Sequence, residues 1–520
     1  MVADYAFCPR FAHYRWVSGI DCDFDTDRAS SKPRESPLRL SWDGVGIAAI
    51  IHEMEHDNGE CFPIVRETQA WAGVEGCRSP GEVALCVQAM VLQANSYLCQ
   101  SGVIECEDSD SRRVVSVDES LLTYTWETIN LTRSAVESSE IPAPLSHDRR
   151  CESCPLSDTC MPDETAFLNS DPGETPADNA DVRRFVPARD DSLPLHVQVQ
   201  GAYVSRQDET LEIRVNDKLI TRTRMMDISQ VCVYGNVQVT TQALRGLFRR
   251  GIPLCYFSSS GWFYGITQST MGKDVRLRMA QYRVAQDQDE ALKAARQFIW
   301  GKIRNCRTML RRNSNEIAVQ DLNALTLHAE KALDADNLLS LMGIEGAAAS
   351  VYFSNFASMI KGGMGFDFQS RNRRPPKDPV NAVLSYLYSM LVKDLTVACM
   401  AAGLDPYAGL CHQPGHGRPS LALDLMEEFR PLICDSVCIR LINTGELRPD
   451  EFTSDGGGVL MADSARKKVI AAYEARMDTL VRHPIFEYTL NYRRVLAVQT
   501  GLLVRWLCGE IPSYPPFCTR

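Results

Sequence analysis

A polar segment divides the chain into two parts of unequal length. Residues 169–194, NSDPGETPADNADVRRFVPARDDSLP, are rich in proline, aspartate, asparagine and serine and contain few apolar side chains. Such a segment buries too little apolar surface to offset the entropy lost on ordering, so it predicts a linker. About 170 residues precede it and about 330 follow it, and each part is long enough to fold by itself.

The overall composition predicts folded domains and no membrane span. Apolar residues fill 45% of the 520 positions, and no run of eighteen uncharged apolar residues occurs. The first twenty residues lack the apolar stretch of a secretory signal, so we expect a cytoplasmic protein. Nineteen cysteines in such a chain favour metal ligands and buried thiols over disulfides.

The charge distribution leaves nucleic-acid binding open. The net charge of −11 argues against a protein coated by nucleic acid, although basic residues gather at 245–250, 304–312 and 371–377. Such clusters either follow a phosphate backbone or form solvated helix faces.

Hydrophobic periodicity predicts a multi-domain α/β plus α architecture. Before the linker, strands near 38–51 and 62–66 and a helix near 81–100 indicate a mixed domain over residues 1–168. Short β-branched and aromatic runs, with one helical stretch near 241–250, predict a small β-rich domain over 195–270. Apolar residues three and four apart then predict a large all-α domain over 271–520.

Four cysteines lie at the two ends of the amino-terminal domain. The run CESCPLSDTCMP contains Cys151, Cys154 and Cys160, and Cys8 in YAFCPR has a similar Cys-Pro neighbourhood. Four thiolates suit a zinc ion and an iron–sulfur cluster equally well, so the spacing alone leaves both open. Either centre would join the beginning of the domain to its end.

These cysteines give residues 1 to about 165 a resemblance to the CRISPR-associated iron–sulfur exonuclease family. The resemblance implies a RecB-like nuclease fold with a [4Fe-4S] cluster on the four cysteines. The family's nuclease motifs are degenerate here, because the best overlay places His52 at the expected aspartate, Val65 at the glutamate and Glu67 at the lysine, and only Gln88 matches. We therefore expect a DNA-binding domain, stabilised by the cluster, with an altered nuclease site.

The run HQPGHGRPSLALDLMEEFRP predicts a helix that carries several acids. Ser420 is expected to cap this helix and Pro431 to end it. Asp424 and Glu427 lie about 60° apart on the helix, and Glu428 borders its apolar stripe. Acids this close to a core either require a cation or form a solvated acidic face, and the pattern allows both.

A second acid stands in an apolar helix. Glu345 is the only charged residue of LLSLMGIEGAAASVYF, which favours a buried or ligated carboxylate, and Gly343 and Gly346 leave room for another chain. Together with a histidine of GLCHQPGHG, the acids would form a Glu, His, Glu set suited to manganese or magnesium. Either histidine by itself would be an ordinary loop residue.

Three long segments, GIEGAAASVYF, RNRRPPKDPVNAVLSYLYSML and GLDPYAGLCHQPGHGRPSLALDLMEEFRP, follow the β-rich region in order. They resemble the CRISPR-associated integrase family over residues 193–520. The resemblance implies a Mn²⁺ or Mg²⁺ site on Glu345, His412 and Glu427, with Asp424 as a further catalytic acid. It also implies possible DNA contacts at Arg371, Arg373, Arg374, Lys377 and His416.

The same resemblance implies spacer acquisition, in which a 3'-hydroxyl of spacer DNA attacks a phosphodiester of the repeat array. The amino-terminal domain would select, process or orient the spacer precursor. The implied partners are double-stranded DNA, a second copy bound through the β-rich domain, and a dimer of a small ferredoxin-fold adaptor that bridges two such dimers. The alternatives are a non-catalytic DNA-end-binding scaffold and a nonspecific metal-dependent nuclease.

Overall fold

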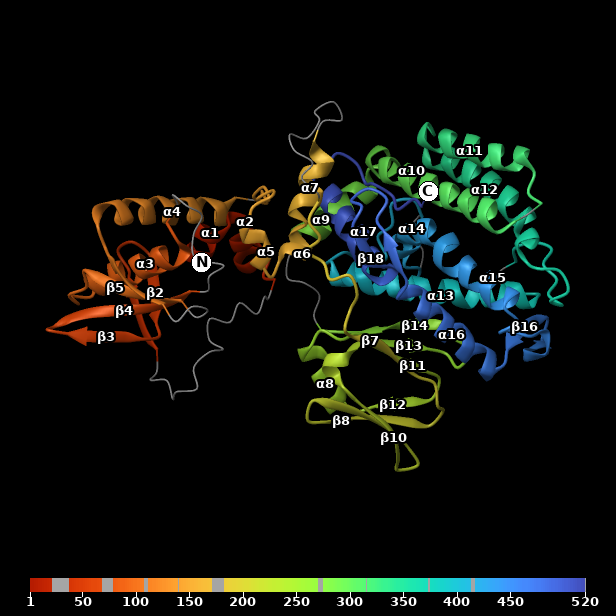
Figure 1. The fold of residues 1–520 in the computed structure, drawn as a ribbon, viewed down its shortest axis with the longest axis horizontal. Helices are drawn as coiled ribbons and strands as arrows, with labels where there is room; N and C mark the ends of the chain where they lie inside the picture. The colour runs from red at the N-terminus through yellow and green to blue at the C-terminus, as the bar shows by residue number, and fades with distance from the viewer. Residues whose placement is uncertain are drawn as a thin grey trace. The chain divides into compact units, whose positions relative to one another are not determined.

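The computed structural model describes the chain apart from residues 21–36, 68–77, 107–110, 139, 171–181, 270–274, 315, 373–374, 413–416 and 520. It divides into two compact units, Met1–Ala180 and Asp181–Arg520 (Figure 1).

A four-stranded mixed sheet forms the centre of the first unit. Its order is β3-β4-β5-β6, and only β4 and β5 run parallel. Parallel neighbours need a crossover connection, which here contains helix α3. The strands are β3 (Met54–Asp57), β4 (Glu60–Glu67), β5 (Ser101–Cys106) and β6 (Ser111–Ser116), and a separate hairpin joins β1 (Leu38–Trp42) to β2 (Ile47–Ile51).

Helices complete this unit and bring its two ends together. Arg150 donates to the carbonyl of Phe7 at 2.7 Å, and Arg10 donates to that of Pro142 at 2.8 Å. The helical segments are α1 (Val2–Phe7), α2 (Pro9–Ala12), η1 (His13–Val17), α3 (Pro80–Ala94), α4 (Glu119–Glu137), α5 (Arg150–Ser153), α6 (Ser157–Cys160) and α7 (Pro162–Asn169).

The strands expected near 38–51 and 62–66 are confirmed, but the helix expected to reach residue 100 ends at Ala94. Ser96 has a φ of 68°, a left-handed conformation that an α-helix cannot continue through. The chain then turns into β5.

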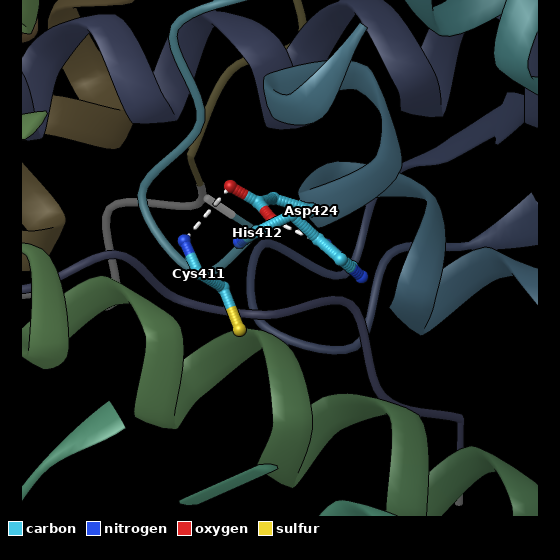
Figure 2. Close-up of side chains that lie close together, drawn as sticks. All are labelled: Cys411, His412 and Asp424. Carbon is cyan, nitrogen blue, oxygen red and sulfur yellow. Dashed lines mark hydrogen bonds and ion pairs between the residues drawn. The ribbon is translucent and has the colours of Figure 1, made fainter. Parts of the chain in front are cut away.

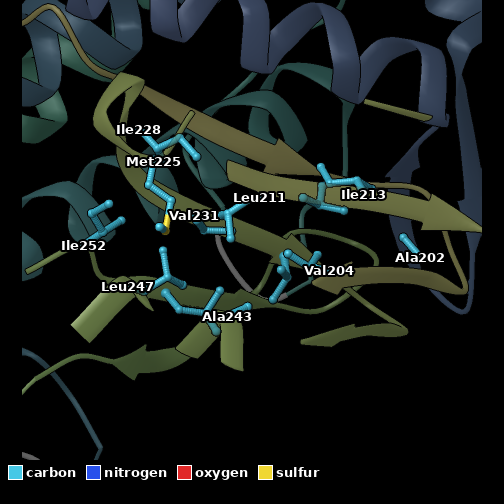
Figure 3. Close-up of a cluster of buried hydrophobic side chains, with 13 residues drawn as sticks. Ala202, Val204, Leu211, Ile213, Met225, Ile228, Val231, Ala243, Leu247 and Ile252 are labelled. Atoms are coloured by element: carbon cyan, nitrogen blue, oxygen red, sulfur yellow. The ribbon is translucent and has the colours of Figure 1, made fainter. Parts of the chain in front are cut away.

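The second unit begins with the β-rich domain. Two four-stranded sheets, β10-β9-β8-β12 and β14-β13-β11-β7, contribute to one core with α8 (Thr241–Arg249), the helix expected near 241–250 (Figure 3). The hydroxyl of Thr240 caps α8 by accepting from Ala243 N. The strands are β7 (Leu193–Val197), β8 (Ala202–Gln207), β9 (Thr210–Val215), β10 (Lys218–Arg224), β11 (Ile228–Tyr234), β12 (Val237–Val239), β13 (Leu254–Phe257) and β14 (Phe263–Thr267), with η3 (Met225–Asp227) before β11.

Long helices form the rest of this unit. They are α9 (Val275–Gln286), α10 (Gln288–Asn313), α11 (Val319–Leu333), α12 (Leu338–Ser354), α13 (Pro379–Ala401), α14 (Ser420–Phe429), α15 (Ser436–Asn443), α16 (Asp463–Met477) and α17 (Tyr492–Leu507), with the short segments η4 (Phe356–Met359), η5 (Arg430–Asp435) and η6 (Pro449–Glu451).

The expectation of an all-α domain is wrong in detail, because two hairpins interrupt the helices. They pair β15 (Phe452–Asp455) with β16 (Gly458–Met461), and β17 (Leu480–Arg482) with β18 (Thr489–Asn491). Gly456 and Gly457 both have positive φ, which permits the tight turn of the first hairpin.

The second half of the expected linker packs against this unit. Val186 is buried, the carbonyl of Ala188 accepts from Asn491 N at 2.9 Å, and Arg184 donates to the carbonyl of Thr489 at 2.8 Å. The expectation that the segment buries no surface is therefore wrong after residue 181.

Buried ionic groups attach the β-rich domain to α13. Asp394 of this helix pairs with Lys393 at 2.6 Å and accepts from Gln230 of β11 at 2.8 Å and from Tyr473 of α16 at 2.6 Å. Among the described residues, α13 is the one helix long and apolar enough to cross a membrane, but 61% of its most apolar window is buried within the fold.

Candidate active site

Three elements bring together the acids and the imidazole named from the sequence. Glu345 comes from α12, His412 from the loop before α14, and Glu427 from α14. His412 Nε2 lies 3.9 Å from Glu427 Oε1. Lys302 of α10 forms ion pairs with Glu345 and with Glu427, the second at 2.6 Å, and so joins the two carboxylates.

The helix that carries Glu427 differs from expectation at both ends. Pro419 occupies the cap position, Ser420 is the first residue of the helix, and the Ser420 hydroxyl donates to the carbonyl of Arg418 at 3.4 Å. Pro431 does not end the helical path, which continues as the π-helical η5 and then as α15. A wider π turn relieves the clash and the missing hydrogen bond that proline causes inside an α-helix, and π turns are frequent at functional sites.

Asp424 fixes the loop that presents His412 (Figure 2). Its Oδ2 accepts the backbone N–H groups of Leu410 at 2.6 Å and Cys411 at 3.0 Å. Its Oδ1 accepts His412 N at 2.9 Å and His412 Nδ1 at 2.7 Å. With Nδ1 bound in this way, Nε2 is the ring nitrogen left to face Glu427.

Gly409 permits the close approach of this loop to α14. A Cβ at this position would lie 2.6 Å from the Cβ of Ser420 and 2.7 Å from the carbonyl oxygen of His412. A larger residue would therefore push His412 away from the helix that bears Glu427.

Cations keep the buried carboxylate of Glu427 ionised. Burial opposes its charged form, yet Arg430, Lys302 and His412 together lower the pKa of Glu427 to about 2. Arg430 lies 2.9 Å from Glu427 Oε1. Burial likewise opposes the charge of Lys302, but Glu427 and Glu345 raise the pKa of this lysine.

Two sets of side chains around His412 could hold a metal. Ligand atoms of Cys411, His412 and Asp424 all lie within 4.8 Å of one another. This set fits a metal poorly, because four hydrogen bonds occupy the oxygens of Asp424 and burial raises the pKa of the Cys411 thiol. The set Glu345, His412 and Glu427 offers carboxylate oxygens and a free imidazole nitrogen, the donors that Mn²⁺ and Mg²⁺ accept.

A basic cavity adjoins Glu345. Its lining includes Lys302, Arg371, Tyr388, Arg430 and Asp435. The guanidinium groups of Arg371 and Arg430 lie 5.2 Å and 5.1 Å from the ring centroid of Tyr388, whose hydroxyl donates to Asp435 at 2.7 Å. Burial raises the pKa of Asp435 to about 6, although two tyrosine hydroxyls bind it.

Of the expected DNA contacts, Arg371 lies in this cavity and Lys377 is exposed at the surface. Arg371 donates to Asn381 Oδ1 at 2.6 Å. The remaining three, Arg373, Arg374 and His416, lie outside the described residues.

Sequence reasoning missed Lys302 and Arg430. Lys302 lies on the same stripe of α10 as the buried Ile299, Ile303 and Cys306, and a lysine on an apolar stripe was the available signal. The sequence around Arg430 carries no comparable signal, because the π turn that orients this side chain does not follow the 3.6-residue period of apolar residues in an α-helix.

In the first unit the four cysteines named from the sequence line one cavity. Cys8 lies between α1 and α2, Cys151 in α5, Cys154 directly after α5, and Cys160 at the end of α6. Burial raises the pKa of Cys154 to about 12 and also raises that of Cys8. The thiols of Cys8 and Cys154 are therefore protonated without a metal, and a metal would have to displace these two protons.

The altered nuclease residues have different surroundings in the first unit. His52 is exposed after β2, and Gln88 donates to the carbonyl of Ile50 at 3.2 Å. Glu67 is buried and accepts from Ser79 at 3.0 Å and from Arg113 at 3.1 Å. Arg113 neutralises Glu67, so an ion pair occupies the position where the overlay expects the family's lysine.

The chain is similar to proteins of one family over most of its second unit. A family model described as CRISPR associated protein Cas1 matches residues 195–475. A CRISPR-associated exonuclease Cas4/endonuclease Cas1 fusion from Geobacter sulfurreducens is 39% identical over 100% of this chain and 98% of its own length. A CRISPR-associated endonuclease Cas1 from Thermus thermophilus is 36% identical over 63% of this chain and 97% of its own.

Among solved structures, a casposase bound to its integration product covers 62% of this chain and 93% of its own, with a TM-score of 0.55 and 21% identity. At that identity the likeness concerns the fold. All of the expected metal ligands, Glu345, His412 and Glu427, fall inside the segment that the family model matches.

Proposed function

This chain belongs to the family of CRISPR-associated exonuclease Cas4/endonuclease Cas1 fusions, and on that basis we propose that it inserts spacer DNA into a CRISPR repeat array. It is an enzyme of CRISPR adaptation, with a metal-dependent DNA integrase and endonuclease activity in its second unit. The observation that carries the proposal is the meeting of Glu345, His412 and Glu427 beside a basic cavity.

The reaction exchanges phosphodiesters: a 3'-hydroxyl of the spacer DNA attacks a phosphate of the repeat, and the old strand end leaves. A Mn²⁺ or Mg²⁺ ion bound at these three residues would supply polarisation of the phosphoryl group and stabilisation of the leaving oxygen. Arg430 holds the buried Glu427 at 2.9 Å. Arg371 and Lys302 place positive charge in the adjoining cavity, which suits an anionic DNA backbone.

Within this site we assign Asp424 a positioning role. Its oxygens are already engaged by three backbone N–H groups and by His412 Nδ1, so it holds the imidazole in orientation for the metal. This assignment specifies the role of the residue that the family resemblance implies to be a further catalytic acid.

For the first unit we propose a RecB-like domain that holds a [4Fe-4S] cluster on Cys8, Cys151, Cys154 and Cys160. Their arrangement around one cavity supports the proposal. We prefer a [4Fe-4S] cluster to a zinc ion because this unit resembles the iron–sulfur exonuclease family.

The fused domain serves spacer processing, and we propose that selecting and orienting the precursor is its main contribution. The ion pair of Glu67 with Arg113 supports this emphasis over cutting. We further propose a cytoplasmic homodimer, joined through the β-rich domain, in which two dimers are bridged by a small ferredoxin-fold adaptor dimer on double-stranded DNA.

A strand-transfer assay tests the proposed chemistry. The protein is mixed with its adaptor, a plasmid containing the repeat, a short DNA duplex with free 3' ends, and Mn²⁺ or Mg²⁺. Wild type should join the ends, and Glu345→Gln or His412→Ala should reduce joining by a factor on the order of a hundred or more. The control Glu330→Gln changes an exposed acid of α11 and should leave joining intact.

The outcomes separate the alternatives. DNA binding by wild type without joining would favour the scaffold, and cleavage without joining would favour the nonspecific nuclease. Unimpaired joining by Glu345→Gln and His412→Ala would reject the assigned site.

A further inference from the structure

Lys302 lies between the two carboxylates proposed as metal ligands. Its ammonium forms ion pairs with Glu345 of α12 and, at 2.6 Å, with Glu427 Oε2 of α14. Only 11% of the Lys302 side chain and 3% of that of Glu427 are exposed. A cation on a third helix, α10, thus connects two acids that come from different elements.

The metal-free protein needs a positive charge between these two carboxylates. Two acids that converge on one point repel each other, and the buried Glu427 needs a counter-ion close by. Arg430 meets part of this need at Glu427 Oε1, while Lys302 neutralises Oε2. Of these two cations, Lys302 is the one that also reaches Glu345.

The two cations differ in how firmly they are held. Arg430 belongs to the same helical path as Glu427, three residues later, and its guanidinium lies over the ring of Tyr388. Lys302 carries a compact charge at the end of a flexible four-carbon chain. The lysine is therefore the cation that can leave without rearrangement of the helix that bears Glu427.

We propose that Lys302 is a positioning residue that holds Glu345 and Glu427 together before metal binding and gives up its place to the divalent ion. The inference rests on the metal site of the proposed function. A +1 ammonium and a divalent cation repel strongly at the separation of these oxygens, so both cannot occupy the point between the carboxylates. Lys302 therefore lowers the affinity of the site for its metal.

The displaced ammonium has polar partners nearby. The cavity beside Lys302 is lined by Asp435 and Tyr352 as well as by Arg371 and Arg430. The two arginines would repel the lysine, whereas Asp435 and the DNA phosphates of a bound substrate would attract it. Lys302 can thus exchange partners while staying at the site.

Mn²⁺ titration by calorimetry, without DNA, tests this proposal on the full chain. Lys302→Met should bind Mn²⁺ roughly tenfold or more tightly than wild type, because the competing charge is gone. Lys293→Met removes an exposed lysine of the same helix, paired with Glu290, and should bind like wild type. Equal or weaker binding by a folded Lys302→Met would overturn the inference.

Thermal unfolding covers the case in which Lys302→Met is unstable. The metal-free variant should unfold at a lower temperature than wild type, and Mn²⁺ should raise its Tm by more than it raises that of wild type. Rescue of an otherwise unfolded variant by Mn²⁺ supports the exchange, and failure of Mn²⁺ to rescue it contradicts the exchange.

The variant Glu427→Gln distinguishes a failure of this inference from a failure of the proposed function. If both wild type and Lys302→Met fail to bind Mn²⁺, or if binding by wild type survives Glu427→Gln unchanged, the proposed metal site itself is wrong. If Glu427→Gln abolishes binding while wild type and Lys302→Met bind equally, only the role of Lys302 is wrong.

Discussion

At the scale of single residues, the site depends on groups that never need to touch the substrate. Asp424 is fully buried and accepts four hydrogen bonds from the loop segment Leu410–His412. One carboxylate therefore defines both the path of the loop and the ring nitrogen that the imidazole presents. An amide has only one acceptor oxygen and cannot replace it.

Asp424→Asn should weaken metal binding while DNA binding persists. The amide N–H₂ would face backbone donors now bound by the carboxylate, so the loop and His412 should lose their fixed orientation. Loss of such a supporting contact costs about 10- to 100-fold in metal affinity or activity. The Mn²⁺ dependence of strand transfer measures this effect.

Asp463→Asn is the matched control for this change, because the Asp463 side chain is 85% exposed. It should show the Mn²⁺ dependence of wild type. If Asp424→Asn shows that dependence as well, Asp424 does not orient His412 for the metal.

At the scale of elements, the carboxy-terminal tail ties together the helices that carry Lys302 and Glu427. Asn305 of α10 donates to the carbonyls of Glu428 and Phe517, both at 2.8 Å. Gly301 leaves room for the tail, since a Cβ there would lie 2.9 Å from the Cβ of Pro516. The carboxyl group of Glu428 accepts from the hydroxyl of Tyr514 at 2.6 Å and from Phe517 N at 2.7 Å, both in the tail.

The buried carboxyl group of Glu428, which binds the tail, should make the stability of the protein depend on pH. Burial raises the pKa of Glu428 from 4.5 to about 8, although its hydrogen bonds with Tyr514, Phe517 and Gln499 act in the opposite direction. Between these two pH values the folded state keeps a proton that the unfolded state releases. The free energy of unfolding should therefore fall as pH rises through this window, by up to about 1.4 kcal/mol per pH unit, and the contribution should level off above it.

Glu428→Gln tests this linkage because glutamine keeps the size of the protonated acid and does not titrate. Urea unfolding between about pH 5 and pH 8 should give a shallower decline of stability for the variant than for wild type. Parallel pH profiles of the two proteins would show that Glu428 is ionised in the folded state.

At the scale of the whole molecule, the sequence predicted best what depends on local pattern. The β-rich region with α8, the long helices and the set Glu345, His412 and Glu427 all lie in continuous segments with distinctive residues. The end of α14 was mispredicted because a proline that stops an α-helix is accommodated by a π turn, a choice made by packing. Lys302 was missed because its partners are distant in sequence.

In the first unit, too, a local sequence pattern could be recognised, whereas contacts that depend on packing could not be predicted. The spacing of Cys151, Cys154 and Cys160 could be recognised, but it did not distinguish zinc from an iron–sulfur cluster. The pairing of Glu67 with Arg113 joins β4 to β6, and no local pattern predicts it. It explains how a buried acid persists there without a metal.

The two units have separate hydrophobic cores, so loss of the proposed cluster should destabilise the first unit and leave the second folded. In the first unit, Phe7, Phe11, Tyr14 and Leu156 pack beside the proposed cluster ligands. Cys154→Ser should therefore abolish the broad visible absorption and bound iron of the protein, and lower the Tm of the first unit by several degrees. Strand transfer by the second unit, measured with spacer DNA that needs no selection, should remain.

Cys106→Ser changes a cysteine of β5 that lies outside the proposed set and should keep both colour and iron. Calorimetry of each variant separates the two unfolding transitions, because each unit buries its own apolar side chains. A colourless wild-type protein with stoichiometric zinc would replace the cluster by a zinc site. If Cys154→Ser retains iron, the ligand set is wrong, and if it loses strand transfer as well, the two units do not act as independent bodies.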